Sequence, residues 1–418
     1  AKTLFPYTTL FRSDGISNWA AMSLVTSGGN SYNGSSGFKI GADAADLIWE
    51  KANQVNVGIN AELFNGRLAL SVDGYYQKTS GLLYNISTLA TTGYTTRTAN
   101  IGSLENKGLE VMVSGKIFDG PFKWELATNL SYTKNKLLSL DGVLDMKING
   151  GGANTGKVMH ALMVGKPVSA FYMLRQDGIY QTDQEVPSKL YAKGVRAGDC
   201  KYFDYNNDGD ITDDDRMYVG KVTPDIYGGI TSTMNWKNFD LSIFCQFAAG
   251  GKILSAWKGC GGTEGTEHLG LASSSIKGYK NGTLVDSEQF YNISKYAANH
   301  YWRGEGTSNT VPRPTLAGTF TGGFGNNLVS TRYLEDASYF KFKTITLGYS
   351  LPHSLLSKIH VTGARIFVSL DNFFTLTKYS GYDPEFSYES NPTGNSYGAD
   401  FGEQATLKSF IIGASINF

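Results

Sequence analysis

Apolar and polar residues alternate along much of this chain with a period of two. Between Val55 and Leu63 every second residue is apolar, and Asn, Gly and Glu occupy the positions between them. The alternation resumes at Leu68, after the dipeptide Asn65-Gly66. Because successive side chains of a strand point to opposite faces, this pattern predicts two strands, each with one apolar and one polar face. Asn-Gly favours the two-residue turn of a β-hairpin.

The same alternation recurs down to the last residue of the chain. The segment from Phe410 to Phe418 places aromatic and aliphatic residues on one face and Gly, Ser and Asn on the other. A strand that ends on a terminal Phe in this way resembles the final strand of outer-membrane barrels. Most expected strands have 9–14 residues, close to the roughly 9–11 residues that a tilted strand needs to cross a bilayer. The nine strands are expected near residues 55–63, 68–73, 106–117, 122–134, 226–236, 239–247, 339–351, 363–375 and 405–418.

The connections between these strands alternate between short and long. Short periplasmic turns and long outer loops are typical of bacterial outer-membrane barrels, whereas a soluble β-sandwich has no reason to place every long loop at one end. We therefore predict an all-β fold, the C-terminal part of a large transmembrane β-barrel with about nine antiparallel strands. Nine is odd, and closed single-chain barrels of bacteria have even numbers, so a larger barrel is expected. The long connections span residues 79–105, 135–225, 248–338 and 376–404.

Composition narrows the possible functions. The 418 residues include 50 Gly and are 13% aromatic, which suits a large β-protein. Lys and Arg together number 37, as do Asp and Glu, so there is no basic excess to indicate nucleic-acid binding. The three cysteines, Cys200, Cys245 and Cys260, form no C-x-x-C pair, which argues against a zinc site. Cys200 and Cys260 both fall in predicted outer loops, and the sequence leaves open whether they pair.

The first residues have a separate interpretation. Residues 3–13 read TLFPYTTLFRS, which is identified as the translation of a common sequencing-adapter oligonucleotide. The alternative is a genuine strand, because FPYTTLF is prone to β-structure. We predict that residues 1–13 derive from the adapter and that residues 14–418 are the C-terminal portion of a barrel whose earlier strands and plug are missing.

An Asp-rich segment predicts a calcium-binding loop. Residues 204–215 match the pattern D-x-[DN]-x-[DN]-G with an acidic residue at the twelfth position. Calcium takes six to eight hard oxygen ligands, which such a loop supplies at alternate positions. The alternative is a solvated acidic turn without metal. The expected structural Ca²⁺ ligands are Asp204, Asn206, Asp208, Asp210, Thr212 and Asp215.

Aromatic residues in the predicted outer loops are candidates for contact with cargo, because flat rings suit sugar rings and peptide side chains. Packing within the loops, or contact with a partner protein, is the alternative for each of them. The candidates are Trp257, Trp302, Tyr379, Tyr382, Tyr388 and Tyr397. No catalytic constellation accompanies them, so no enzymatic activity is expected.

An ordered series of short blocks resembles the SusC/RagA-type TonB-dependent outer-membrane transporters. The resemblance covers about residues 40–418, and its specificity lies in the order of the blocks. The blocks are Asn100-Ile101-Gly102 with Asn106-Lys107-Gly108-Leu109-Glu110, Trp124-Glu125 with Asn129-Leu130-Ser131-Tyr132, Lys134-Asn135-Lys136, Asp177-Gly178-Ile179-Tyr180-Gln181, Gly198-Asp199, residues 204–216, residues 224–229, Tyr301-Trp302-Arg303 with Pro312-Arg313-Pro314, residues 334–339, and Ser380-Gly381-Tyr382-Asp383-Pro384-Glu385.

The resemblance implies a large plugged barrel of about 22 strands in the bacterial outer membrane. It further implies a SusD-like surface lipoprotein that closes the barrel and import of glycan oligomers, or of peptides, with energy from the TonB complex. The other partner implied is outer-membrane lipid. A non-transporting surface β-domain, used for binding or adhesion and braced by calcium, is the alternative function.

Overall fold

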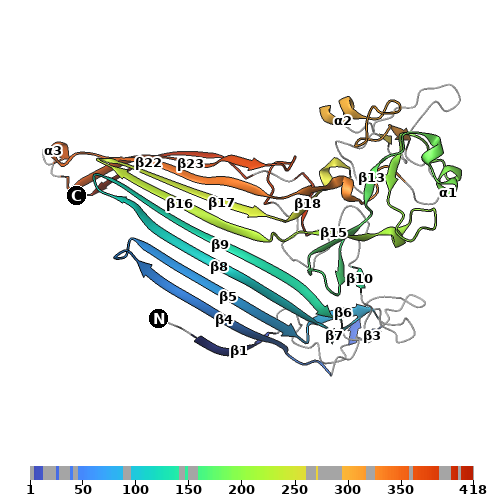
Figure 1. Cartoon of the computed structure of the whole chain (residues 1–418), viewed down its shortest axis with the longest axis horizontal. Coiled ribbons are helices and arrows are strands. Elements are labelled where there is room, and N and C mark those ends of the chain that lie inside the picture. Colours follow the sequence, from blue (N-terminus) through green and yellow to red (C-terminus); the bar gives the residue numbers. More distant parts are fainter. Residues whose placement is uncertain are drawn as a thin grey trace. The chain divides into compact units, whose positions relative to one another are not determined.

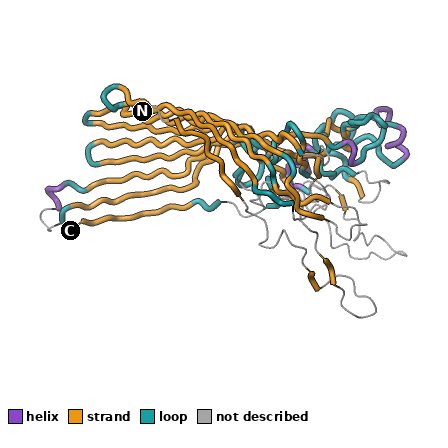
Figure 2. Tube along the Cα trace, turned by 90° about the horizontal axis from the view of Figure 1, so that it is seen from below, coloured by secondary structure: helices purple, strands orange, loops and turns teal. Residues whose placement is uncertain are grey.

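The computed structural model describes residues 4–12, 25–27, 38–40, 46–87, 96–140, 146–148, 159–259, 270–271, 294–316, 325–356, 361–385, 397–402 and 406–417. Most of these residues lie in strands, as Figure 2 shows. Ten antiparallel strands form the main sheet, and neighbouring strands are hydrogen-bonded to each other. In sheet order they are β1 (Leu4–Arg12), β4 (Glu50–Leu63), β5 (Leu68–Ser80), β8 (Ser103–Asp119), β9 (Phe122–Ser139), β16 (Ile226–Trp236), β17 (Phe239–Ala249), β22 (Tyr339–Ser350), β23 (Gly363–Thr377) and β25 (Ser409–Asn417).

All nine predicted strands are present in this sheet, so the predicted all-β fold is confirmed. The predicted turn at Asn65-Gly66 is confirmed too. Asn65 and Gly66 have φ angles of 55° and 77°, and the N–H of Arg67 donates to the carbonyl of Phe64 at 3.3 Å. Positive φ at both central residues gives the turn the twist that suits an antiparallel hairpin.

The tenth strand, β1, lies in the segment that the sequence analysis set aside. It pairs with β4 from Leu4↔Val57 to Arg12↔Glu50, with a register shift between Phe5 and Thr8. The sheet therefore has ten strands rather than nine, because a β-prone segment of any origin can pair with an open sheet edge. The adapter origin of residues 1–13 stays a prediction.

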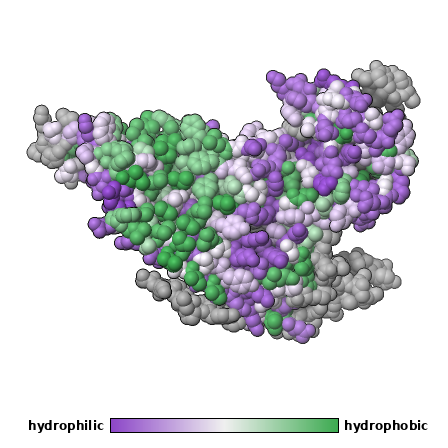
Figure 3. Space-filling model, in the orientation of Figure 1, coloured by the Kyte–Doolittle hydropathy of each residue, from purple (hydrophilic) through white to green (hydrophobic). Residues whose placement is uncertain are grey.

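Two compact units make up the chain, and the main sheet contributes strands to both. In the first unit β4, β5, β8 and β9 run side by side (Figure 1). The register aligns Ile59 with Val72, Val72 with Val111, and Val111 with Leu130, so an aliphatic row crosses four strands on one face. Ile59 is 64% exposed although it is apolar, as the predicted lipid-facing surface requires. Figure 3 shows apolar side chains gathered over the strands.

In the second unit β23 pairs with β22 and with β25, and one face of these three strands is apolar. Val368 lies opposite both Leu347 and Ile412, and Ile412 is 67% exposed. The amphipathic final strand predicted from the sequence is therefore confirmed in β25.

The long connections carry the remaining elements. Most are short strands that pair locally, and the three α-helices in the described part of the chain have at most six residues. Among the described residues, no helix is long and apolar enough to cross a membrane. The remaining elements are β2 (Val25–Ser27), β3 (Phe38–Ile40), β6 (Leu83–Ser87), β7 (Thr96–Asn100), β10 (Met146–Ile148), β11 (Ala161–Met163), β12 (Ala170–Met173), β13 (Gln176–Ile179), η2 (Asp183–Glu185), α1 (Ser188–Ala192), β14 (Cys200–Tyr202), η3 (Asp213–Asp215), β15 (Met217–Lys221), β18 (Lys252–Ser255), η4 (Ala256–Lys258), β19 (Gly270–Leu271), α2 (Lys295–His300), β20 (Thr315–Leu316), η6 (Thr331–Tyr333), β21 (Leu334–Asp336), α3 (His353–Leu356) and β24 (Ala399–Asp400).

The connections of the second unit enclose hydrophobic cores. One core gathers Phe171, Leu254, Tyr333 and Ala399, each at most 1% exposed. Phe171 and Ala399, two of its members, are more than 200 residues apart in the sequence. These loops therefore pack together into one folded region. This region contains both pockets described below.

Candidate functional site

An aromatic pocket of about 380 Å³ lies in the loop region of the second unit. We call it the Trp257 pocket. Its walls come from η4, from the segment that follows β23, and from β24 with the two residues after it. The lining residues are Trp257, Ser380, Gly381, Tyr382, Asp400 and Gly402.

Tyr379 fixes one wall of this pocket from beneath. Its hydroxyl donates to Asp400 Oδ2 at 2.6 Å and accepts from Trp257 Nε1 at 3.3 Å. The N–H of Gly402 donates to Asp400 Oδ1 at 2.8 Å. Burial and the hydrogen bond to Asp400 raise the pKa of Tyr379, so the phenol keeps its proton and remains a donor. The Trp257 ring and the Asp400 carboxylate are thereby held in place.

Glu335, in β21, holds the rim of the same pocket. It accepts hydrogen bonds from the N–H of Ser380 at 2.9 Å and from its hydroxyl at 2.7 Å. It also accepts from Ser255 Oγ at 2.6 Å and forms an ion pair with Lys258 at 2.9 Å. Burial alone raises the pKa of Glu335, but the hydrogen bonds from Lys258, Ser255 and Ser380 outweigh burial and lower it. The rim is therefore anchored by an ionised carboxylate.

A second set of charges anchors the loop of residues 378–385, which carries the pocket rim, to β22. We call Lys341, Lys343, Asp383 and Glu385 the Lys341 network. Lys341 is 2% exposed and donates to both oxygens of Asp383 at 2.9 and 3.1 Å, and also to Glu385. Lys343 donates to Glu385 at 3.2 Å. Because Asp383 directly follows Tyr382, this network sets the position of the pocket rim.

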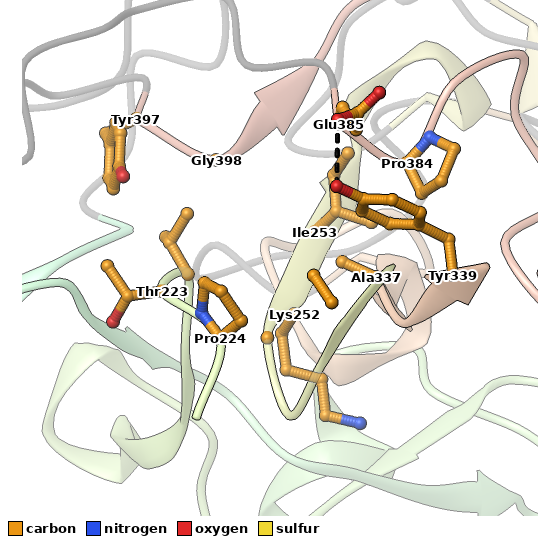
Figure 4. Close-up of a pocket in the computed structure, with 13 residues that line it drawn as sticks. Thr223, Pro224, Lys252, Ile253, Ala337, Tyr339, Pro384, Glu385, Tyr397 and Gly398 are labelled. Carbon is orange, nitrogen blue, oxygen red and sulfur yellow. Dashed lines mark hydrogen bonds between the residues drawn. The ribbon is translucent and has the colours of Figure 1, made fainter. Parts of the chain in front are cut away.

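A second pocket, of about 240 Å³, lies between Pro384 and Glu385 at the end of this loop and Lys252 and Ile253 in β18. In Figure 4, Tyr397 and Thr223 stand on one side of it and Tyr339 with Glu385 on the other. The Tyr339 hydroxyl donates to Glu385 at 2.8 Å, the bond that the dashed line marks. The Glu385 carboxylate also accepts from Gln246, Lys341 and Lys343. With four donors already bound, it has little capacity left for a ligand.

Trp302 belongs to a different cluster, in which several blocks of the sequence pack together. Its Nε1 donates to Gln181 Oε1 at 3.2 Å. Nearby, Arg313 donates twice to Asp199, at 2.8 and 3.0 Å, and Asp199 is 0% exposed. Gly198 has φ +90° and lies against the Trp302 ring, where a Cβ would come within 2.5 Å of it. Gly198-Asp199, Tyr301-Trp302-Arg303 and Pro312-Arg313-Pro314 therefore form one structural core.

The Asp-rich loop has a compact backbone held by its own carboxylates. Asp204 accepts from the N–H of Gly209 at 2.7 Å, and Asp215, which is 0% exposed, accepts from the N–H of Tyr205 at 2.9 Å. Asp210 pairs with Lys193 at 2.6 Å, and this hydrogen bond lowers the pKa of Asp210. Within the described ranges, no group of three or more Asp, Glu, His or Cys side chains is arranged to hold a metal ion. Calcium binding at this loop stays a prediction.

The structure thus separates the predicted cargo-contact residues. Trp257 and Tyr382 line the Trp257 pocket with Tyr379 behind them, whereas Tyr397 lines the second pocket. Tyr388 lies outside the described residues, as does Cys260. Cys200 is buried, which raises the pKa of its thiol. Its pairing stays untested.

Sequence reasoning missed three residues that shape the pocket: Asp400, Glu335 and Lys341. Glu335 stands in one of the blocks quoted above, and that block was a signal that it matters. Asp400 and Lys341 stand in no such block. Their importance follows from burial and from partners that are distant in sequence, which no local pattern reveals.

The chain is similar in sequence to several known proteins. A family profile described as "TonB dependent receptor-like, beta-barrel" matches residues 7–244. TonB-dependent receptor P3 of Formosa agariphila is 30% identical over 380 residues, which cover 89% of this chain and 34% of that protein. TonB-dependent receptor SusC of Bacteroides thetaiotaomicron is 26% identical over 384 residues, or 89% of this chain and 32% of that protein. This chain therefore spans about a third of the length of these relatives.

Among solved structures, the RagAB peptide transporter matches with a TM-score of 0.73 at 23% identity. The match covers 99% of this chain and 40% of that one. At this identity the likeness concerns the fold. The matched relatives are named as receptors and transporters, in agreement with the expectation that the chain is not an enzyme.

Proposed function

The chain belongs to the TonB-dependent receptor-like β-barrel family of the bacterial outer membrane, and on that premise we propose that it takes part in the import of glycan oligomers. The observation that carries the proposal is the Trp257 pocket. It sets two aromatic rings, Trp257 and Tyr382, beside the carboxylate of Asp400. Sugar rings stack on flat aromatic faces, and their hydroxyl groups donate hydrogen bonds to carboxylates.

Peptides are the second candidate cargo. The structural neighbour RagAB is described as a peptide transporter, and its likeness to this chain extends over 99% of the chain. Aromatic rings also accept apolar side chains, so the pocket is compatible with peptides. Binding measurements with both classes of oligomer distinguish the two.

The proposal includes partners. A SusD-like lipoprotein would close the barrel from outside, and the TonB complex would supply energy through a part of the receptor that precedes this chain. The supporting observations are the likeness to SusC and to RagAB, together with the ordered blocks of sequence. Copurification of a tagged receptor with its neighbouring lipoprotein tests the first partner.

Replacing Trp257 with Ala should lower the affinity for the cargo oligomer roughly tenfold, because an aromatic platform at the centre of a site carries a large share of binding energy. Tyr296→Ala is the matched control, since Tyr296 is a 51% exposed aromatic outside the pocket. Isothermal titration of the detergent-purified protein measures both variants. Equal affinity of Trp257→Ala and the unmodified protein would contradict the assignment of the pocket.

We also propose that the loop of residues 204–215 binds a structural Ca²⁺ ion through Asp204, Asn206, Asp208, Asp210, Thr212 and Asp215. Support comes from the D-x-[DN]-x-[DN]-G pattern and from φ +77° at Gly209, the position where such loops turn sharply. The ion pair between Lys193 and Asp210 is compatible with this site. Asp210 stands at position 7 of the loop, which supplies its backbone carbonyl rather than its carboxylate.

Calcium titration should give a saturable binding isotherm in the unmodified protein and none in Asp208→Ala, since that substitution removes a central carboxylate ligand. Asp214→Asn serves as the control, because it changes the charge by the same amount at a position outside the ligand set. Identical traces for the unmodified protein and Asp208→Ala would remove the calcium proposal.

A further inference from the structure

The Asp400 carboxylate in the Trp257 pocket is buried, and none of the described residues supplies a counter-ion for it. Asp400 is 4% exposed, and it accepts hydrogen bonds from the neutral Tyr379 hydroxyl and from the N–H of Gly402. Across the part of the chain that the structure describes, it forms no ion pair with Lys, Arg or His. Buried charges in proteins are ordinarily paired, because desolvation of an isolated ion is costly. None of the described residues therefore neutralises the negative charge of Asp400.

Lys258, which follows Trp257 in the chain, is already neutralised. Lys258 forms its ion pair with Glu335 at 2.9 Å, and its ammonium lies 5.4 Å from the centre of the Trp257 ring. These two charges cancel, so the negative charge of Asp400 remains in excess. The six lining residues of the pocket include one acidic side chain and no basic one.

The aromatic rings favour the same kind of ligand. Trp257 and Tyr382 both line the pocket, and Tyr382 is 79% exposed and accessible to a ligand. Cations bind the face of such rings, most strongly that of Trp, and the attraction grows when water is excluded. A cation in this pocket would therefore gain from both the rings and the carboxylate.

We infer that the Trp257 pocket selects cargo bearing a positively charged ammonium group, and that the group is carried by an amino sugar of the glycan oligomer. The assignment of a glycan rests on the proposed function. An uncharged sugar would leave the Asp400 charge uncompensated, and an acidic sugar would be repelled by it. The pocket should therefore discriminate by charge among oligosaccharides of equal length.

Titration of the detergent-purified protein with three oligosaccharides of equal length tests this inference. The probes are oligomers of glucosamine, N-acetylglucosamine and galacturonate, which are cationic, neutral and anionic. Oligomers of glucosamine should bind roughly tenfold more tightly than those of N-acetylglucosamine, the effect of one charge-assisted hydrogen bond. Asp400→Asn should abolish that preference, so that glucosamine and N-acetylglucosamine oligomers of equal length bind with the same affinity. Asp177→Asn, at an exposed carboxylate paired with Arg175, should keep the preference.

The outcomes separate this inference from the proposed function. Equal binding of the cationic and neutral oligomers by the unmodified protein overturns the charge selectivity and leaves glycan import standing. Tighter binding of an oligolysine peptide than of glucosamine oligomers would show that the ammonium group belongs to a cationic peptide and would overturn the assignment to an amino sugar. Absence of binding by any oligosaccharide overturns the proposed function itself. The comparison of probes on the unmodified protein holds even where Asp400→Asn fails to fold.

Discussion

Lys341→Met should release the loop of residues 378–385 from β22. Lys341 is the buried cation between Asp383 and Glu385, so its loss leaves two carboxylates facing each other without their shared donor. Removing one partner of a buried ion pair costs about 3–5 kcal/mol, because the remaining charge is desolvated and unpaired. We expect faster amide hydrogen exchange across this loop and weaker cargo binding, since Tyr382 and the Trp257 pocket depend on it.

Lys343→Met is the matched control for that experiment. Lys343 contacts the same Glu385, but its side chain is 30% exposed, so water can replace it. Partly exposed pairs contribute about 0–1 kcal/mol, and the loop should stay in place. If Lys341→Met exchanged its loop amides no faster than Lys343→Met, the Lys341 network would not be the anchor of the pocket rim.

Arg313→Ala should unfold the core around Gly198 and Trp302. The substitution leaves Asp199, which is 0% exposed, without the two hydrogen bonds at 2.8 and 3.0 Å. Asn326 and the N–H of Arg196 still donate to Asp199, but neither neutralises its charge. We expect a loss of about 3 kcal/mol, and limited proteolysis should cleave this region much faster than in the unmodified protein.

The control for Arg313 is Arg175→Ala. Arg175 pairs with Asp177 at 2.8 Å, but the two side chains are 40% and 37% exposed. The expected cost is below about 1 kcal/mol, and the rate of cleavage should barely change. Equal protease sensitivity of the two variants would show that the Asp199 pair is not what stabilises this core.

The strands were predictable because their signal is local. Alternation between Val55 and Leu63, or between Phe410 and Ile416, reports directly which face of a strand meets lipid. Asn65-Gly66 identified its turn for the same reason, since positive φ angles suit these two residues. Each of these features needs only a few neighbouring residues, and all of them are present in the structure.

The site was only partly predictable, because it is assembled from segments far apart in the chain. Tyr379 and Tyr382 look equivalent in sequence, yet Tyr379 is 5% exposed beneath the pocket and Tyr382 is 79% exposed at its rim. Trp302 looked like a candidate for cargo contact, yet it packs against Gly198 in another core. Whether an aromatic residue lines the pocket or packs in a core depends on its burial and on partners that are distant in sequence. A local sequence pattern predicts neither of these.

By itself the sequence determined the class of fold, the positions of the strands and the family resemblance, because strand alternation and the order of short motifs survive without coordinates. Only the tertiary structure decided that Trp257, Tyr382 and Asp400 share one pocket and that Asp400 is buried there with no basic partner among the residues that the structure describes. The physical reason is that the free energy of a buried charge depends on which groups surround it in space. In this chain those groups come from loops more than a hundred residues apart.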